Sequence, residues 1–428
     1  MNNKTINRQR YLDEALLFRD TDLIKVVTGV RRCGKSTLLE LVREKIESEN
    51  VPGRAFAFLN LESMECTVAN AKELYDFFRE RLSPTGRTYI FLDEPQRIEG
   101  WQNAVNAMRV DFDCDIYLTG SNAYLLSSEL STYLSGRYVE IKMLPLSFSE
   151  YAEFCGVSFA SGRSIALDPS GEPIAFDDLF ERYLAFGGMP GIASLDIDQR
   201  RHSLYLSSLY DAVATRDIVN RERNKSQSKV TNPDLLRDIA TYLADNIGNQ
   251  TSASGIANTL TSAGAKTTHP TAASYIAALN DAYLFYRASR YDLHGKAILR
   301  TNPKEYIVDL GLRSYLAGYR TTDTGRLFEN AVYLELLYRG YSVHVGKIYD
   351  KEIDFVAIKD DERIYIQATD EMLDERTLNR EVAPLKTLKE AFSKMIVVRK
   401  GSYASDIDGV RIVNAQSFFL GNEQFKSA

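Results

Sequence analysis

The sequence predicts an α/β protein: a parallel sheet with flanking helices, then a helical and winged-helix-like region, then a second α/β region. Three observations predict this order. Apolar, β-rich runs alternate with amphipathic segments over 23–142, three short helix-like segments and a hairpin pattern fill 230–300, and strand patterns return over 326–428. The expected domains are 1–145, 146–229, 230–320 and 321–428.

The first region carries five strand-like runs separated by helix-like segments. One of these segments, STLLELVREKI, places Leu38, Leu39, Val42 and other apolar residues on one broad face. Alternating strands and helices of this length imply a parallel sheet with helices on both sides. The strands are expected at 23–28, 54–60, 88–93, 115–120 and 138–143.

The remaining regions follow in chain order. PLSFSEYAEF is helix-like, 161–173 is a Gly/Ser/Pro-rich break, and a helical stretch then reaches past Arg223. Three helices and a two-stranded hairpin around His294 and Gly295 follow the winged-helix plan. The last region is expected to contain a helix, three strands at 341–348, 351–359 and 363–370, a helix at 384–394 and a strand at 395–400.

Composition excludes several classes of protein. With 44% hydrophobic and 26% charged residues, the chain is neither disordered nor collagen-like. A net charge of −6 excludes a uniformly basic nucleic-acid coat, and four cysteines without a CxxC pair suggest neither a zinc site nor a disulfide framework. No apolar run reaches about 18 residues, and the N-terminus lacks a signal-peptide pattern. We therefore expect a multidomain cytoplasmic protein without a membrane segment.

The first motif follows the strand expected at 23–28 and opens the helix after it. Residues 29–36 match G-x-x-x-x-G-K-[ST] at every fixed position. Such a loop points backbone N–H groups at a phosphate, Lys35 reaches the β- and γ-oxygens, and the Ser36 hydroxyl binds Mg²⁺. The predicted nucleotide-binding residues are Gly29, Val30, Arg31, Arg32, Cys33, Gly34, Lys35, Ser36 and Thr37.

The second motif is Tyr89-Ile90-Phe91-Leu92-Asp93-Glu94, four apolar strand residues followed by two acids. Asp93 at the carboxyl end of a buried strand would hold Mg²⁺, and Glu94 would orient and deprotonate the attacking water. The alternative is an ordinary solvated turn. An acid directly after the Asp favours hydrolysis of ATP over a GTPase, so ATP and Mg²⁺ are the expected cofactors.

A third strand, 115–120, ends in Thr119-Gly120-Ser121-Asn122. A polar side chain there would lie between the two motifs and face the γ-phosphate. Asn122 is the first candidate and Ser121 the second, against the alternative of an ordinary polar turn.

Three arginines have less certain roles. Arg137, before the fifth strand, is a catalytic candidate: an arginine finger acting in a neighbouring subunit, a phosphate contact in its own subunit, or a structural residue. Arg31 and Arg32 would pair with phosphates or hold the loop against acidic neighbours.

In combination, these residues resemble a known family. VVTGVRRCGKSTLL, FLDEPQRIEGW, IYLTGSNAYLLSSELSTYLSGRY, PLSFSEY and Gly187-Gly188-Met189-Pro190 are similar to a prokaryotic AAA-type P-loop ATPase family over essentially the whole chain. The resemblance implies ATP binding and hydrolysis, a winged helix after the core, and a C-terminal domain of unknown function with a restriction-endonuclease-like fold.

Endonuclease-like folds use a helical Glu, an Asp, and a (Glu/Asp/Gln)-x-Lys to bind Mg²⁺ and activate water. Glu329 or Glu335 would be the first and Asp354 the second, but the third position has Gln367 and Thr369. The lysine is missing and the carboxylate is an amide. The C-terminal domain is therefore predicted to be catalytically degenerate.

DNA is a candidate partner through the winged-helix-like region, because 201–320 carries a net charge of +5. Phosphate contacts would come from Arg221, Arg223, Lys225, Lys229, Arg287, Arg290, Lys296 and Arg300.

The first hypothesis for function is an ATPase acting as a switch or motor, with an unidentified protein partner and a homo-oligomer as its candidate assemblies. The second is an ATP-regulated DNA-binding protein of defence or regulation. The third is an ATP-gated nuclease, which Gln367 and Thr369 disfavour.

Overall fold

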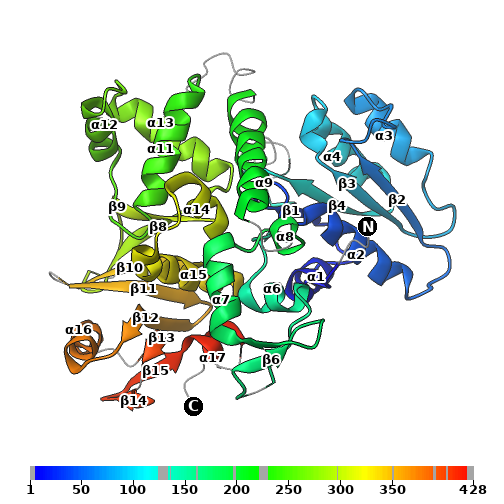
Figure 1. Ribbon diagram of the computed structural model, residues 1–428. Helices are drawn as coiled ribbons and strands as arrows, with labels where there is room; N and C mark the ends of the chain where they lie inside the picture. The colour runs from blue at the N-terminus through cyan, green and yellow to red at the C-terminus, as the bar shows by residue number, and fades with distance from the viewer. Residues whose placement is uncertain are drawn as a thin grey trace. The chain divides into compact units, whose positions relative to one another are not determined.

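The computed structural model groups the chain into two compact units (Figure 1). Unit 1 comprises Met1–Leu144 and Asp281–Tyr283, and unit 2 comprises Pro145–Asn280 and Leu284–Ala428. The structure describes residues 5–123, 134, 136–160, 162–195, 199–220, 230–295, 297–348, 351–388, 392–401 and 403–421.

Unit 1 is built on a five-stranded parallel sheet with the strand order β2-β3-β4-β1-β5. The predicted parallel sheet is confirmed. Its elements are α1 (Gln9–Leu17), β1 (Ile24–Thr28), α2 (Lys35–Glu47), β2 (Ala55–Asn60), α3 (Ala71–Arg79), β3 (Thr88–Asp93), η1 (Pro95–Arg97), α4 (Trp101–Asp111), β4 (Cys114–Gly120) and β5 (Tyr138–Lys142).

Helices cover both faces of this sheet because its strands are apolar on both sides. On one face, Ile90 and Leu92 of β3 pack in a core with Phe78 of α3 and Trp101 of α4. Alternate residues point to the other face, where α1 and α2 lie (Figure 1) and Phe91 stacks on Tyr117 with ring centroids 5.1 Å apart. The sheet is therefore rigid, and its strand ends are suitable positions for functional residues.

Unit 2 combines helices with two further sheets. Its first elements are α6 (Phe148–Phe154), β6 (Ile165–Leu167), β7 (Pro173–Ala175), α7 (Phe176–Phe186), α8 (Pro190–Ala193), α9 (Gln199–Ala212), η3 (Val213–Asn220), α11 (Pro233–Asp245), α12 (Ala253–Ser262) and α13 (His269–Asp281). Then follow β8 (Phe285–Asp292), β9 (Ala297–Ile307), α14 (Leu310–Ala317), η4 (Thr321–Asp323), α15 (Thr324–Tyr338), β10 (Ser342–Ile348), β11 (Lys351–Lys359), β12 (Glu362–Met372), α16 (Glu375–Lys386), β13 (Ser393–Gly401), β14 (Asp406–Ile407), β15 (Val410–Asn414) and α17 (Ala415–Phe419).

The hairpin β8–β9 is part of the larger sheet of unit 2. That sheet has eight strands in the order β14-β15-β13-β12-β11-β10-β8-β9. Strand β8 pairs with β9 antiparallel and with β10 parallel, so Arg290 lies opposite Val345. The hairpin expected as a wing thus continues the C-terminal sheet, which crosses the expected boundary between 320 and 321. The division into four domains stays a prediction.

Two expectations for local structure are wrong. The helix expected at 384–394 is instead α16, which begins after Asp374 because that side chain accepts the backbone N–H of Thr377 at 2.7 Å. Strand β13 already starts at Ser393. The break at 161–173 also contains structure, because β6 pairs antiparallel with β7.

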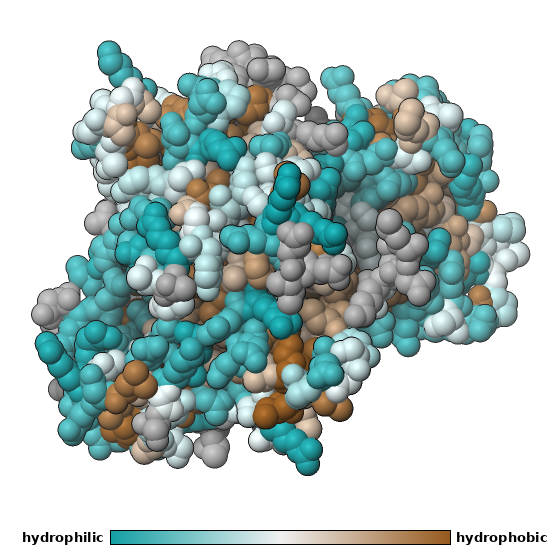
Figure 2. All heavy atoms as spheres, in the orientation of Figure 1, coloured by the Kyte–Doolittle hydropathy of each residue, from teal (hydrophilic) through white to brown (hydrophobic). Residues whose placement is uncertain are grey.

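Apolar side chains on the surface are scattered. Figure 2 shows brown spheres dispersed among teal ones on the face in view, and exposed large apolar residues include Leu17, Met64 and Leu373. Among the described residues, no helix is long and apolar enough to cross a membrane.

Candidate functional site

The loop over residues 29–36 joins β1 to α2 at the carboxyl edge of the unit 1 sheet. Gly29 has a φ of 145°, and a Cβ placed on it would lie 2.1 Å from the carbonyl oxygen of Met143. Gly34 has a φ of 107° and directly precedes the first residue of α2, Lys35. Both fixed glycines of the motif are therefore required by backbone conformation, and the first also by close packing.

Lys35 folds back over this loop. Its side chain is buried, and its Nζ donates hydrogen bonds to the carbonyl oxygens of Gly29 at 3.0 Å and Val30 at 3.1 Å. Ser36 and Thr37, which follow on the helix, are exposed. Since these two partners of Lys35 are neutral carbonyls, an incoming anion would be a stronger partner for its ammonium group.

Arg31 has an acidic neighbour in the structure. Its guanidinium lies 2.5 Å from Glu62 Oε1, and Arg97 reaches the same oxygen at 2.7 Å. Burial would raise the pKa of Glu62, but hydrogen bonds from the two arginines lower it below its ordinary value. This contact is of the kind that the second alternative from the sequence describes, and a phosphate contact by Arg31 stays a prediction. Arg32 is exposed in a left-handed conformation with a φ of 64°.

Cys33 and Val30 are buried in the floor of the loop. The carbonyl oxygen of Cys33 accepts a hydrogen bond from Arg8 at 3.1 Å, and the same guanidinium donates to the carbonyl oxygen of Leu144 at 3.0 Å. Arg8 therefore links the loop to the segment after β5. The sequence pattern does not reveal this contact between distant segments.

The acidic pair lies at the end of β3. Asp93 is 2% exposed, and its Oδ1 accepts the Thr119 hydroxyl at 2.5 Å. Glu94 has a left-handed φ of 57°, and its backbone N–H donates to the same hydroxyl at 2.9 Å. Non-glycine residues in this conformation are uncommon and cluster at functional sites. Thr119 thus positions both acids, a role that our sequence analysis missed.

Strand β4 lies between β1 and β3, so its end separates the loop from the acidic pair. Ser121 is buried, and its hydroxyl donates to Glu94 Oε2 at 3.4 Å. Asn122, the first candidate from the sequence, is also buried. The hydrogen bond to Glu94 thus involves Ser121, the second candidate from the sequence.

Arg137 lies at the opposite edge of the sheet. Its carbonyl oxygen accepts the backbone N–H of Ile24 at the start of β1, and its guanidinium donates to Asn106 at 3.3 Å. The five-residue strand β1 spans about 16 Å from there to the loop. Arg137 therefore lies away from the phosphate loop of its own chain, and its role stays a prediction.

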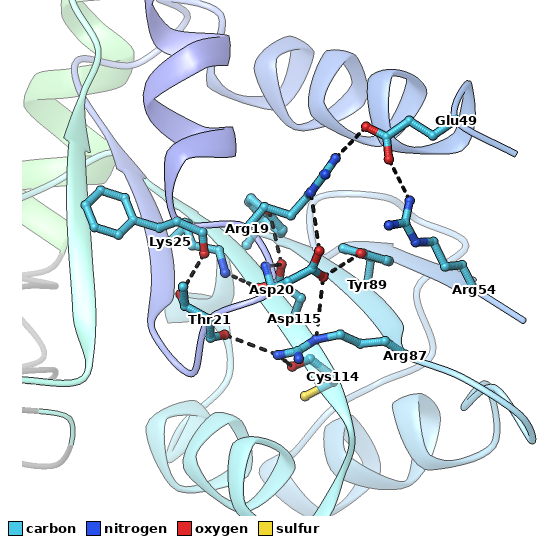
Figure 3. A network of polar contacts seen from close by, with 12 residues as sticks. Arg19, Asp20, Thr21, Lys25, Glu49, Arg54, Arg87, Tyr89, Cys114 and Asp115 are labelled. Atoms are coloured by element: carbon cyan, nitrogen blue, oxygen red, sulfur yellow. Dashed lines mark hydrogen bonds and ion pairs between the residues drawn. The ribbon is translucent and has the colours of Figure 1, made fainter. Parts of the chain in front are cut away.

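A polar network ties β1 to β4 at this amino edge (Figure 3). Lys25 and Asp115 form an ion pair with both side chains fully buried. Asp115 Oδ2 also accepts the backbone N–H of Asp20 at 2.9 Å, and Asp20 accepts the Tyr89 hydroxyl at 2.6 Å. Burial lowers the pKa of Lys25, although the charge of Asp115 opposes the shift. The network holds β1 against β4 at their amino ends. The carboxyl end of β1 leads into the phosphate loop, and the carboxyl end of β4 leads to Ser121.

In unit 2, one of the two glutamates expected from an endonuclease-like fold, Glu329, acts electrostatically on Asp354, whereas the other, Glu335, has a different partner. Glu329 lies beside Lys304, while Glu335 pairs with Arg339 at 2.7 Å. Burial and the charge of Glu329 raise the pKa of Asp354 well above its ordinary value. Among the described residues, no group of three or more His, Cys, Asp or Glu side chains is arranged to hold a metal ion.

Some of the basic residues considered for DNA can be placed. Arg287 is paired with Glu305 at 2.8 Å, and Arg290 is half-buried in β8. The side chain of Arg300 is not among those described. Arg221, Arg223, Lys225, Lys229 and Lys296 lie outside the described residues.

The unit 1 residues fit a nucleoside triphosphate with Mg²⁺. The start of α2 supplies backbone N–H donors and the positive end of a helix dipole, and Lys35 adds a cation. Ser36 and Asp93 supply the hydroxyl and carboxylate oxygens that Mg²⁺ prefers. The site therefore combines phosphate-binding and ion-binding groups, with Glu94 beside them.

Two family models match parts of the chain. A family model described as an AAA domain matches residues 21–152, and a model described as a domain of unknown function (DUF8612) matches 177–323. The second match covers part of the expected segment 146–229 and all of the expected segment 230–320, whereas the sequence resemblance placed a domain of unknown function at the C-terminus.

Two relatives match most of the chain. An uncharacterized protein of Haemophilus influenzae is 39% identical over 422 residues, which cover 98% of this chain and 100% of that protein. An uncharacterized protein of Methanocaldococcus jannaschii is 29% identical over 84% of this chain and 77% of that protein.

Among solved structures, a Walker-type ATPase of Pyrococcus abyssi matches with a TM-score of 0.48 and 18% identity, over 72% of this chain and 94% of that chain. Because it is 39% identical to the Haemophilus influenzae protein over 98% of its own length, the chain belongs to the same family as that protein, and its residues 21–152 match an AAA domain.

Proposed function

We propose that the protein binds ATP and hydrolyses it with Mg²⁺, and that it uses this reaction as a molecular switch or motor. The observation that carries the proposal is the meeting of three strand ends at one edge of the unit 1 sheet. The loop follows β1, Ser121 follows β4, and Asp93 with Glu94 ends β3. Binding and hydrolytic groups thus share one edge.

Each residue has a distinct role in this proposal. Lys35 leaves the carbonyl oxygens of the loop and pairs with the β- and γ-phosphates, while the N–H groups at the start of α2 hold the phosphate chain. Ser36 and Asp93 would hold Mg²⁺, which would supply positive charge for the phosphate oxygens.

Glu94 acts as the general base. Its carboxylate accepts a proton from water as the water oxygen attacks the γ-phosphorus and the bond to the β-phosphate oxygen breaks, which yields ADP and phosphate. Ser121 orients this carboxylate, because its hydroxyl already donates to Glu94. Asn122 is proposed to face the γ-phosphate as a sensor.

For unit 2, we propose that α11–α13 with β8–β9 follow the winged-helix plan and that the C-terminal sheet with α15 is endonuclease-like without nuclease activity. Support comes from the three helices before the hairpin and from the antiparallel β10–β12 strands beside α15. The alternative remains an ATP-regulated DNA-binding protein with little turnover.

The test is ATP turnover by the full chain with three variants. Glu94→Gln should retain ATP affinity but lose turnover by ~10²-fold or more, as expected for loss of a general base. Lys35→Ala should lose detectable ATP binding, and Glu99→Gln, which changes an exposed acid five residues along, should behave as wild type.

Unchanged turnover in Glu94→Gln would mean that another group activates the water. Unchanged ATP affinity in Lys35→Ala, measured by calorimetry, would refute the phosphate-loop assignment. Duplex DNA should not alter turnover, whereas strong stimulation by DNA would favour the alternative.

A further inference from the structure

A lysine lies among the acids of unit 2 where the endonuclease-like resemblance would require a divalent metal ion. Lys304 of β9 is 4% exposed, and its Nζ lies 3.0 Å from Glu329 Oε1 and 2.8 Å from Glu352 Oε1. The hydroxyl of Tyr306, two residues along β9, donates to the same Glu329 oxygen at 2.7 Å. The charge of Lys304 also acts on the buried Asp354 of β11.

The oxygens that a metal ion would need already accept hydrogen bonds. Asp354 Oδ2 accepts the backbone N–H of Ala368 at 2.9 Å, and Gln367 Oε1 accepts the backbone N–H of Asp354 at 2.6 Å. Glu329 Oε1 accepts hydrogen bonds from both Lys304 Nζ and the Tyr306 hydroxyl. Mg²⁺ needs oxygens at about 2.0–2.1 Å, and a buried ammonium would repel it. The residues do not fit a metal ion.

The sequence motif expects a lysine at position 369, where this chain has Thr369. Lys304, which comes from another strand, places a lysine side chain near the same acids. Lys304 belongs to β9, at one edge of the sheet, and not to β12, which carries Gln367. The ammonium group of Lys304 forms ion pairs with two carboxylates, Glu329 of α15 and Glu352 of β11. It is therefore not available to an acid pair that would bind a metal ion. This arrangement neutralises the acids internally.

We propose that Lys304 is a built-in cation that replaces a divalent metal ion, and that its ion pairs fasten β9 to α15 and β11. Lys304 and Gln250 lie inside the 177–323 match, and their partners Glu329 and Glu352 lie beyond it. Gln250 contributes by donating to Glu352 Oε2 at 2.8 Å and by bridging to Lys304 through the backbone. These ion pairs would hold the segment within 177–323 against α15 and β11 without a metal ion.

The test compares the full-length protein with Lys304→Met and Lys304→Arg in the absence of nucleotide. Thermal unfolding is followed with EDTA or with MnCl₂. Lys304→Met should unfold at a lower temperature in EDTA, and Mn²⁺ should restore part of the loss because the freed carboxylates accept it. Wild type and Lys304→Arg, which retain the cation, should show no Mn²⁺-dependent shift.

A double variant, Lys304→Met with Glu352→Gln, keeps the proposal testable if Lys304→Met does not fold. It removes one charge of each sign, so it should fold and should respond to Mn²⁺ less than Lys304→Met does. Two results would overturn the proposal. One is an unfolding temperature of Lys304→Met that Mn²⁺ does not raise. The other is plasmid cleavage by the wild type with Mn²⁺ that Lys304→Met abolishes, which would make Lys304 a nuclease lysine.

Discussion

A single hydroxyl group links the two acids of the candidate site. Thr119 donates to the carboxylate of Asp93 and accepts the backbone N–H of Glu94. The second contact supports the left-handed backbone of Glu94, a conformation that costs free energy for a non-glycine residue. Thr119 is therefore a positioning residue, since it acts on hydrolysis through its two neighbours.

We predict that Thr119→Val lowers ATP turnover about tenfold with little change in ATP affinity. Valine has nearly the same shape but leaves both hydrogen bonds unmade, and a bond to a charged group contributes roughly 1.5–3 kcal/mol. Thr119→Ser retains the hydroxyl and should stay near wild type. Steady-state kinetics with separately measured ATP binding make the comparison, and equal turnover in Thr119→Val would contradict the role.

At the level of elements, a buried carboxylate joins the ends of two helices in unit 2. Asp309 precedes α14 and accepts the backbone N–H groups of Leu312 at 3.0 Å and Gly188 at 2.7 Å. Gly187, after α7, has a φ of 80°, and a Cβ there would lie 2.3 Å from Asp309. The Gly187-Gly188 pair of the family resemblance is thus explained by this junction.

Burial raises the pKa of Asp309 to about 6, although backbone N–H groups oppose the shift. Such a carboxyl binds its proton more tightly in the folded chain. Its contribution to stability is therefore complete below the unfolded pKa of about 3.9 and is lost as the pH rises through the folded value.

We predict that the free energy of unfolding of wild type relative to Asp309→Asn falls by roughly 2 kcal/mol as the pH rises from 4 to 7. Denaturant unfolding at several pH values measures this difference. Asp374→Asn is the control, because hydrogen bonds from the Thr377 backbone lower the pKa of the exposed Asp374 and its pH dependence has the opposite sign. Parallel curves for wild type and Asp309→Asn would refute the prediction.

For the whole molecule, the position of Arg137 bears on assembly. It lies at the amino edge of the sheet, away from the loop of its own chain, and its side chain is exposed. We therefore favour the arginine-finger role, in which Arg137 would enter the phosphate site of a second copy of the chain.

We predict that Arg137→Ala lowers turnover by ~10³-fold at unchanged ATP affinity, and that wild-type turnover per chain rises with protein concentration. Mixing Arg137→Ala with Glu94→Gln chains should restore partial activity, because each supplies the residue that the other lacks. Arg79→Ala, which changes an exposed arginine of α3, is the control. A mixture as inactive as its parents would leave Arg137 with a structural role.

Much of the site was predictable because its chemistry is local in the sequence. The loop from Gly29 to Ser36 and the acids Asp93 and Glu94 each depend on one strand and the turn after it. Thr119 and Arg8 were missed, since their partners lie 25 or more residues away in the sequence. Lys304 was missed for the same reason, because the expected lysine was sought two residues after Gln367.

Local sequence patterns were sufficient to predict the parallel sheet of unit 1 and the phosphate loop on it, because apolar periodicity and glycine positions act within short segments. The meeting of distant side chains became visible only in the folded chain. It placed the β8–β9 hairpin in the C-terminal sheet, Arg137 at the far edge from the loop, and Lys304 between two carboxylates. These three positions depend on the order of the strands in each sheet and on which charges become buried together. Both are decided only when separate segments of the chain pack against one another.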